Sequence, residues 1–151
     1  MSDAAEAKLL ARVPITVRWR DLDAYNHVNN STFLTYLEEA RLVWLAGIEG
    51  EWKTDAFSPV LAASQVNFRE QIAWPGELVV EVRCERIGNS SLTLAHRITS
   101  ANGERLYSDA SVVMVWVDPA SARSVPLPKA VRAACSGRTG PCASVTSSRR
   151  A

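Results

Sequence analysis

The chain has 151 residues, of which 47% are hydrophobic and 22% charged, and its formal net charge is +1 at pH 7. This length suits one domain with a substantial core, and a second domain would be hard to fit. Basic and acidic residues are interspersed, so there is no electrostatic footprint for nucleic acid, and a small molecule is the expected partner.

The three cysteines, Cys84, Cys135 and Cys142, lack the spacing of a metal site. Their odd number argues against a secreted disulfide framework. No apolar stretch approaches the roughly 20 residues of a membrane span, and the acidic N-terminus lacks a signal-peptide pattern. We therefore expect a cytoplasmic protein that contacts no membrane.

The first predicted element is a strand over 14–20, in which Ile15, Val17 and Trp19 share one face. The loop that follows, over 21–30, contains two carboxylates, a histidine and several side-chain amides. Asp, Asn and Tyr residues follow one another there and favour turns. Such a density of polar groups before an apolar helix indicates either a site or a set of backbone caps.

A single long helix is predicted over 31–46, because apolar residues recur there at three- and four-residue spacing. Asn30 or Ser31 is the expected N-cap, and Gly47 the expected C-terminal stop. The helix is apolar enough to be largely enclosed by the rest of the chain.

Four strand-like segments follow the helix, at about 58–71, 78–86, 91–100 and 105–117. Gly88-Asn89 and Asn102-Gly103 lie where hairpin turns are needed. The order of one strand, one helix and four strands predicts an α+β domain. Its five-stranded antiparallel sheet would wrap around one long central helix.

The end of the chain divides into a short predicted helix over 126–134 and a segment over 136–151 that is rich in Ser, Gly and Arg. That segment has almost nothing to bury, so we expect it to be a disordered tail. The expected domain therefore covers 1–135.

The run Arg18-Trp-Arg-Asp-Leu-Asp-Ala-Tyr-Asn-His-Val-Asn-Asn30, followed by Phe33-Leu-Thr-Tyr-Leu-Glu-Glu-Ala-Arg41, closely resembles the opening motif of one enzyme family. These are the hotdog-fold acyl-CoA thioesterases of the 4-hydroxybenzoyl-CoA thioesterase type. The segments 67–70, 75–78 and 88–91 look like later positions of the family, so the resemblance covers about 12–130.

The resemblance implies a hotdog fold and a hydrolase that releases a carboxylic acid and coenzyme A from an acyl-CoA substrate. It also implies a homodimer or homotetramer. Two other readings stay open: hydrolysis of acyl groups from acyl carrier protein, and a non-catalytic module that binds acyl-CoA, since fold does not fix function.

Asp23 matches the catalytic carboxylate of the family, which would attack the thioester carbonyl or take a proton from water. A turn or cap aspartate is the alternative. The start of the following helix offers backbone N–H groups that could polarise the carbonyl, and in the family this end and the carboxylate come from different subunits. His27 matches a polar position near the reacting carbonyl, where it could orient water or hold a proton; a structural histidine is the alternative.

Substrate contacts are expected from two regions. Tyr25 stands where related acyl-carrier-protein thioesterases have an asparagine, and Asn30 could either cap the helix or touch substrate. Coenzyme A would be held by arginine forks and by a turn that permits close backbone approach, although solvated strand positions explain the same arginines. The candidates for this role are Arg69, Arg86, Gly88, Asn89 and Ser90.

Tyr36, Glu38 and Arg41 match a Tyr-x-Glu-x-x-Arg pattern of the family, and we expect Glu38 and Arg41 to pair on one helix face. His96 lies in the apolar register of its strand, which indicates a hydrogen-bonded core histidine. The sequence has no serine nucleophile elbow, phosphate-binding glycine loop or zinc spacing, so no cofactor and no metal are expected.

Overall fold

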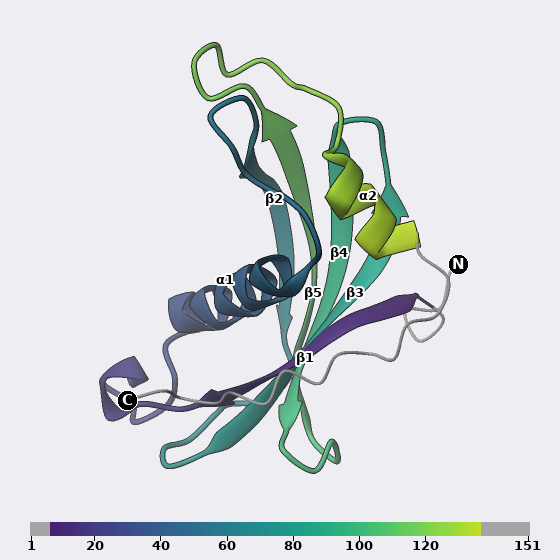
Figure 1. Ribbon diagram of the computed structural model, residues 1–151. Coiled ribbons are helices and arrows are strands. Elements are labelled where there is room, and N and C mark those ends of the chain that lie inside the picture. The colour runs from purple at the N-terminus through teal and green to yellow at the C-terminus, as the bar shows by residue number, and fades with distance from the viewer. Residues whose placement is uncertain (1–6, 137–151) are drawn as a thin grey trace, which may run out of the picture.

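The computed structural model describes residues 7–136 and shows one five-stranded sheet with a long helix packed against it (Figure 1). The elements, in chain order, are β1 (Lys8–Thr16), the 3-10 helix η1 (Trp19–Asp21), α1 (Asn30–Gly47), β2 (Ser58–Phe68), β3 (Glu77–Ile87), β4 (Ser91–Ser100), β5 (Leu106–Val117) and α2 (Lys129–Ser136). The predicted α+β class is confirmed, as are the central helix and the four strands that follow it.

The strands lie in the order β1-β3-β4-β5-β2, and each neighbouring pair is antiparallel. The backbone N–H of Gly88 donates to the carbonyl of Ser91 at 2.8 Å and closes the turn between β3 and β4. Gly103 adopts a positive φ of 77° between β4 and β5, a conformation that glycine takes at little cost. Both predicted hairpin turns are confirmed.

The core lies between α1 and the inner face of the sheet. Because strand side chains alternate between faces, every second residue of β4 points inward, and the buried apolar residues of α1 pack against these. The inward-facing set includes Leu92, Leu94 and Ile98, each fully buried. Edge strand β2 differs, since most of its side chains are exposed.

The first strand begins and ends earlier than the sequence pattern predicts. We expected it over 14–20 with Trp19 pointing inward, but β1 covers Lys8–Thr16 and the Trp19 side chain is 71% exposed. The carboxylate of Asp21 accepts a hydrogen bond from the backbone N–H of Arg18 at 2.9 Å and closes η1. This local hydrogen bond turns the chain at η1, so the strand ends although the alternation of apolar and polar residues continues to Arg20.

The second helix, α2, packs against β1 and β3, on the other side of the molecule from the motif loop (Figure 1). Val131 and Cys135 of α2 are buried in the core cluster, together with Leu127 just before the helix. The predicted helix is therefore confirmed with its bounds shifted a few residues. Apart from Ser136, which ends α2, the predicted tail lies outside the described residues.

Candidate functional site

The loop between η1 and α1 is held by its own backbone. The N–H of Asp23 donates to the carbonyl of His27 at 2.8 Å, and the N–H of Asn26 donates to the carbonyl of Asp23 at 3.1 Å. Leu22 and Val28 form an isolated antiparallel bridge across the base of the loop. Asn26 takes a positive φ of 62°, which asparagine tolerates better than most residues. The loop is thus a closed ring that presents its side chains in fixed positions.

Asp23 lies at the centre of this ring and is half-buried. Its Oδ1 accepts hydrogen bonds from the backbone N–H groups of Tyr25 at 2.8 Å and His27 at 3.4 Å. Within residues 7–136, the hydrogen bonds of this carboxylate all go to Oδ1. One oxygen therefore orients the group, and Oδ2 is available to a reactant.

Asp21 has a different role, because it ties the loop to α1. Its Oδ2 accepts a hydrogen bond from the hydroxyl of Tyr36 at 2.7 Å and one from the Arg18 N–H at 2.9 Å. Burial and the hydrogen bond to Asp21 raise the pKa of Tyr36 above its ordinary value, so this phenol stays protonated. Sequence reasoning missed this contact; the Tyr36 match in the family pattern was the one signal that could have indicated it.

Helix α1 begins one residue earlier than predicted. The N-cap is Asn29, whose side-chain oxygen accepts from the Ser31 N–H at 3.0 Å, and not Asn30 or Ser31. The Thr32 N–H also donates to the backbone oxygen of Asn29, at 2.8 Å. Asn30 is the exposed first residue of the helix, and its N–H has no intrahelical acceptor. This amide is therefore the free donor at the helix start.

His27 is one of the residues that line a cavity beside the motif loop. Within the described residues, its ring Nδ1 is buried and has no hydrogen-bond partner. The cavity has a volume of about 520 Å³ and is lined mainly by the 70–78 segment, together with Arg105 and Tyr107. Ion pairing between Arg105 and Glu70 at 3.3 Å closes part of its wall. The structure joins Asp23 to the backbone of His27, through the Asp23 N–H and the Asp23 Oδ1, and not to the His27 imidazole.

The other candidate contacts fall into two groups. Tyr25 extends from the motif loop with its side chain 81% exposed. Arg69, just after β2, is bidentate to Asp109, with Nε–Oδ2 at 2.8 Å and Nη2–Oδ1 at 3.3 Å. The Arg69 guanidinium is therefore already paired with the Asp109 carboxylate.

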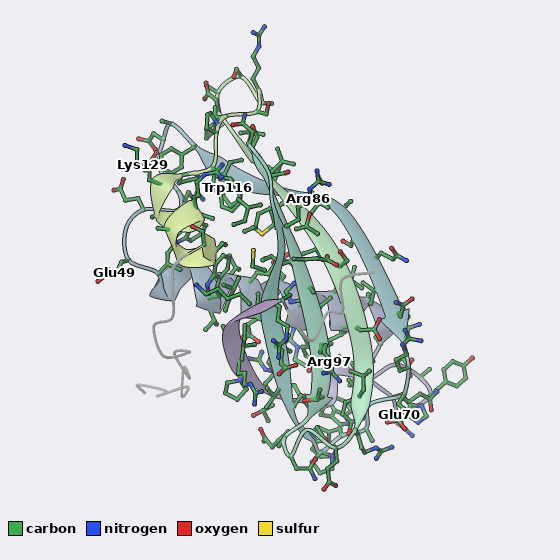
Figure 2. All side chains as sticks on the ribbon, turned by 90° about the vertical axis from the view of Figure 1, so that its right-hand side faces the viewer. Glu49, Glu70, Arg86, Arg97, Trp116 and Lys129 are labelled. Atoms are coloured by element: carbon green, nitrogen blue, oxygen red, sulfur yellow. The ribbon has the colours of Figure 1, made fainter. Side chains whose placement is uncertain are left out.

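Arg86 and the 88–90 turn lie at the far end of β3 from the motif loop. The Glu77 end of β3 pairs with Thr16 beside the loop, and the strand spans about 35 Å. Figure 2 shows Arg86 and Glu70 near opposite ends of the sheet. The Arg132 guanidinium also donates to the Gly88 carbonyl at 2.9 Å. Within one chain, these coenzyme A candidates are not brought together with Asp23.

The predicted pair between Glu38 and Arg41 does not form. Glu38 is exposed, whereas the Arg41 side chain turns into the core and approaches His96, with Nη1 and Nε2 3.5 Å apart. Burial and the nearby charge of Arg41 lower the pKa of His96 to about 3. His96 is thus buried and neutral, and its predicted position in the core is confirmed.

Among residues 7–136, no group of three or more His, Cys, Asp or Glu side chains could hold a metal ion. In the same part of the chain, no helix is long and apolar enough to cross a membrane. The cytoplasmic location stays a prediction.

A model of the thioesterase-like superfamily matches residues 17–135. The chain belongs to this superfamily. Its solved relatives include XC229 of Xanthomonas campestris, which is 48% identical with a TM-score of 0.72, over 79% of this chain and 99% of that one. A thioesterase of Thermus thermophilus in complex with coenzyme A and zinc is 37% identical with a TM-score of 0.70, over 82% of this chain and 90% of the other.

A further relative of this thioesterase-like chain is the long-chain acyl-CoA thioesterase FadM of Escherichia coli, 29% identical over 69% of this chain and 80% of that protein. Membership confirms the resemblance and the hotdog fold predicted from the sequence. It also confirms that the protein is an enzyme of the thioester hydrolase class.

Proposed function

We propose that this thioesterase hydrolyses acyl-CoA and that Asp23 is its catalytic carboxylate. The observation that carries the proposal is the position of Asp23, whose Oδ1 is fixed by two backbone N–H groups while Oδ2 is available. Two relatives support the substrate class: the Escherichia coli protein is named for long-chain acyl-CoA, and the Thermus thermophilus thioesterase was solved with coenzyme A.

Two chemical routes fit this geometry. As a nucleophile, Oδ2 attacks the thioester carbonyl carbon and expels the coenzyme A thiolate, and water then hydrolyses the resulting mixed anhydride. As a general base, Oδ2 takes a proton from a water that attacks the same carbon. Both routes give a carboxylic acid and coenzyme A, and both place negative charge on the carbonyl oxygen on the way.

That oxygen needs a hydrogen-bond donor, and we assign the role to the free N–H of Asn30 at the start of α1. A helix N-terminus carries partial positive charge and unbonded N–H groups, and a donor aimed at a developing oxyanion contributes about 2.7–4 kcal/mol to transition-state stabilisation. In this proposal the donor comes from α1 of a second copy, as in the family that the motif resembles.

We assign the contact with the second copy to β2. This edge strand presents unpaired backbone groups along one side, which favour pairing with another strand. Large apolar side chains are also exposed on β2 and on the neighbouring face of α1, and they would be covered in a dimer. These are Leu34, Val60, Leu61 and Phe68, each 41–48% exposed.

We assign His27 a role in proton transfer: it would donate or accept a proton on the side of the loop that faces the cavity. His27 lines a cavity that is large enough for water. Histidine is the side chain that most often transfers protons in enzymes.

The proposal is tested by measuring thiol release from short, long and aromatic acyl-CoA thioesters, alongside acyl groups carried on acyl carrier protein. We expect turnover of at least one acyl-CoA, and we expect Asp23→Asn to lower kcat on that substrate by about a hundredfold. Hydrolysis confined to the carrier-protein thioesters would overturn the substrate assignment. Tight binding of acyl-CoA without turnover would show a binding module instead.

A further inference from the structure

Two cysteines meet where α2 packs on the sheet, and the proposed mechanism uses neither. Cys84 is on β3 and packs against the core cluster that includes Cys135 of α2. The inward-facing residues of β3 alternate from Val80 through Val82 to Cys84, so the Cys84 side chain points to the face that α2 covers. Both residues are free cysteines.

The packing of α2 holds the pair in place from two sides. Lys8 of β1 is the register partner of Cys84, and its ammonium donates to the carbonyl of Ala134, the residue before Cys135, at 3.1 Å. Arg132 donates to the Gly88 carbonyl at 2.9 Å, at the end of β3. The backbones on both sides of the thiols are therefore tied together by contacts that do not involve sulfur.

The two thiols differ in reactivity. The neighbouring Cys135 thiol lowers the pKa of Cys84, and the Lys8 ammonium lowers it further, against the opposing effect of partial burial. The Cys84 sulfur and burial together raise the pKa of Cys135, whose side chain is 4% exposed. Because the thiolate is the reactive form, Cys84 is the thiol that meets an oxidant, and Cys135 is the neighbour that can resolve the product.

We propose that Cys84 and Cys135 form an oxidation site, at which a hydroperoxide converts the two thiols into a disulfide between β3 and α2. The Cys84 thiolate attacks one peroxide oxygen, the O–O bond breaks, and a sulfenic acid forms while the released hydroxide takes a proton. The Cys135 sulfur then attacks the sulfenic sulfur, so that an S–S bond forms and the S–O bond breaks. The departing hydroxide takes the Cys135 proton, and with hydrogen peroxide two waters result as sulfur loses two electrons.

The disulfide would link α2 covalently to β3. Helix α2 contributes Val131 to the core cluster and the segment just before it contributes Leu127, so release of α2 would uncover apolar surface. A cross-link between residues far apart in the sequence removes freedom mainly from the unfolded chain. Oxidation would therefore stabilise the fold.

The test treats the full-length protein with hydrogen peroxide, blocks residual thiols, and digests with trypsin without reduction. Trypsin separates the three cysteines into the peptides 84–86, 133–138 and 139–149. We expect a cross-link between 84–86 and 133–138 that lacks two hydrogen atoms and disappears on reduction. Cys142→Ser is the matched control and should give the same cross-link.

The single variants at the site separate the two roles. In Cys135→Ser, we expect Cys84 to stop at a sulfenic acid that dimedone traps, and in Cys84→Ser, Cys135 should stay unmodified. Oxidised wild type should melt about 5 °C or more above the reduced form, with no such shift in Cys135→Ser. A link through Cys142, a link between chains, or free Cys84 and Cys135 thiols after treatment would overturn the proposal.

Discussion

Replacing Tyr36 by phenylalanine removes the hydroxyl that joins α1 to the motif loop and keeps the ring that packs in the core. The Tyr36 side chain is 4% exposed, and its hydroxyl donates to the Asp21 carboxylate at 2.7 Å. A hydrogen bond to a charged group contributes about 1.5–3 kcal/mol. Asp21 keeps its bond to the Arg18 N–H, so we expect a loss of about 2 kcal/mol in the free energy of unfolding.

A loss of this size corresponds to a fall in Tm of about 4–8 °C for a chain of this length. Urea denaturation of wild type and Tyr36→Phe measures it directly, and Tyr25→Phe is the matched control. The Tyr25 side chain is 81% exposed, so its loss of a hydroxyl should change stability by less than about 0.5 kcal/mol. Equal stability of wild type and Tyr36→Phe would refute the role given to Asp21.

The pH dependence of the same pair of proteins gives a second readout. Because the pKa of Tyr36 is raised in the folded protein, its contribution is fully present below the ordinary tyrosine pKa of about 10. It is lost as pH rises beyond that value, since the unfolded chain then releases the proton first. We expect the stability difference between wild type and Tyr36→Phe to shrink above about pH 10.

Three further changes probe other parts of the fold. The lowered pKa of His96 means that the unfolded chain binds the proton first, so stability should fall as pH drops from about 6.5 towards about 3; His96→Gln should have a shallower acid slope in urea titrations. Leu61→Lys on the β2 edge should convert a dimer to a monomer by light scattering, and an unchanged mass would count against pairing through β2. Asn29→Ala should cost about 1 kcal/mol in urea denaturation through loss of the N-cap, with Asn30→Ala nearly neutral; equal losses would contradict the cap assignment.

Most of the fold follows from short-range patterns in the sequence. The spacing of apolar residues predicted α1, and the alternation of Val80 and Val82 with charged neighbours predicted β3. Glycine turns placed the hairpins. These features depend on residues a few positions apart, for which periodicity is a direct physical signal.

The errors arose where a specific side-chain contact overrode the spacing of residues in the sequence. Trp19 fits the alternation of a strand, but Asp21 closes a turn at that point. Glu38 and Arg41 have the spacing of a helical ion pair, but burial draws the Arg41 side chain to His96 on the sheet. The contact between Tyr36 and Asp21 joins two elements, so no period in the sequence encodes it.

At the candidate site, the sequence predicted that Asp23 lies in a loop before α1, and the structure confirms that position. The hydrogen-bond partners of the two carboxylates could be found only from the structure. The sequence could not tell which acid of the Asp-x-Asp pair is structural from spacing alone. In the structure, Asp21 bonds to Tyr36 and Asp23 bonds to its own loop. The far position of Arg86 depends on strand register, which a single sequence specifies poorly.

The most direct measurement compares Asp23→Asn with Asp21→Asn on the best acyl-CoA substrate. We expect Asp23→Asn to lower kcat at least roughly a hundredfold with an unchanged Tm, because an amide is neither a nucleophile nor a base. Asp21→Asn should lower Tm, since it weakens the bond to Tyr36. Near-wild-type turnover by Asp23→Asn would contradict the assignment of Asp23 as the catalytic carboxylate.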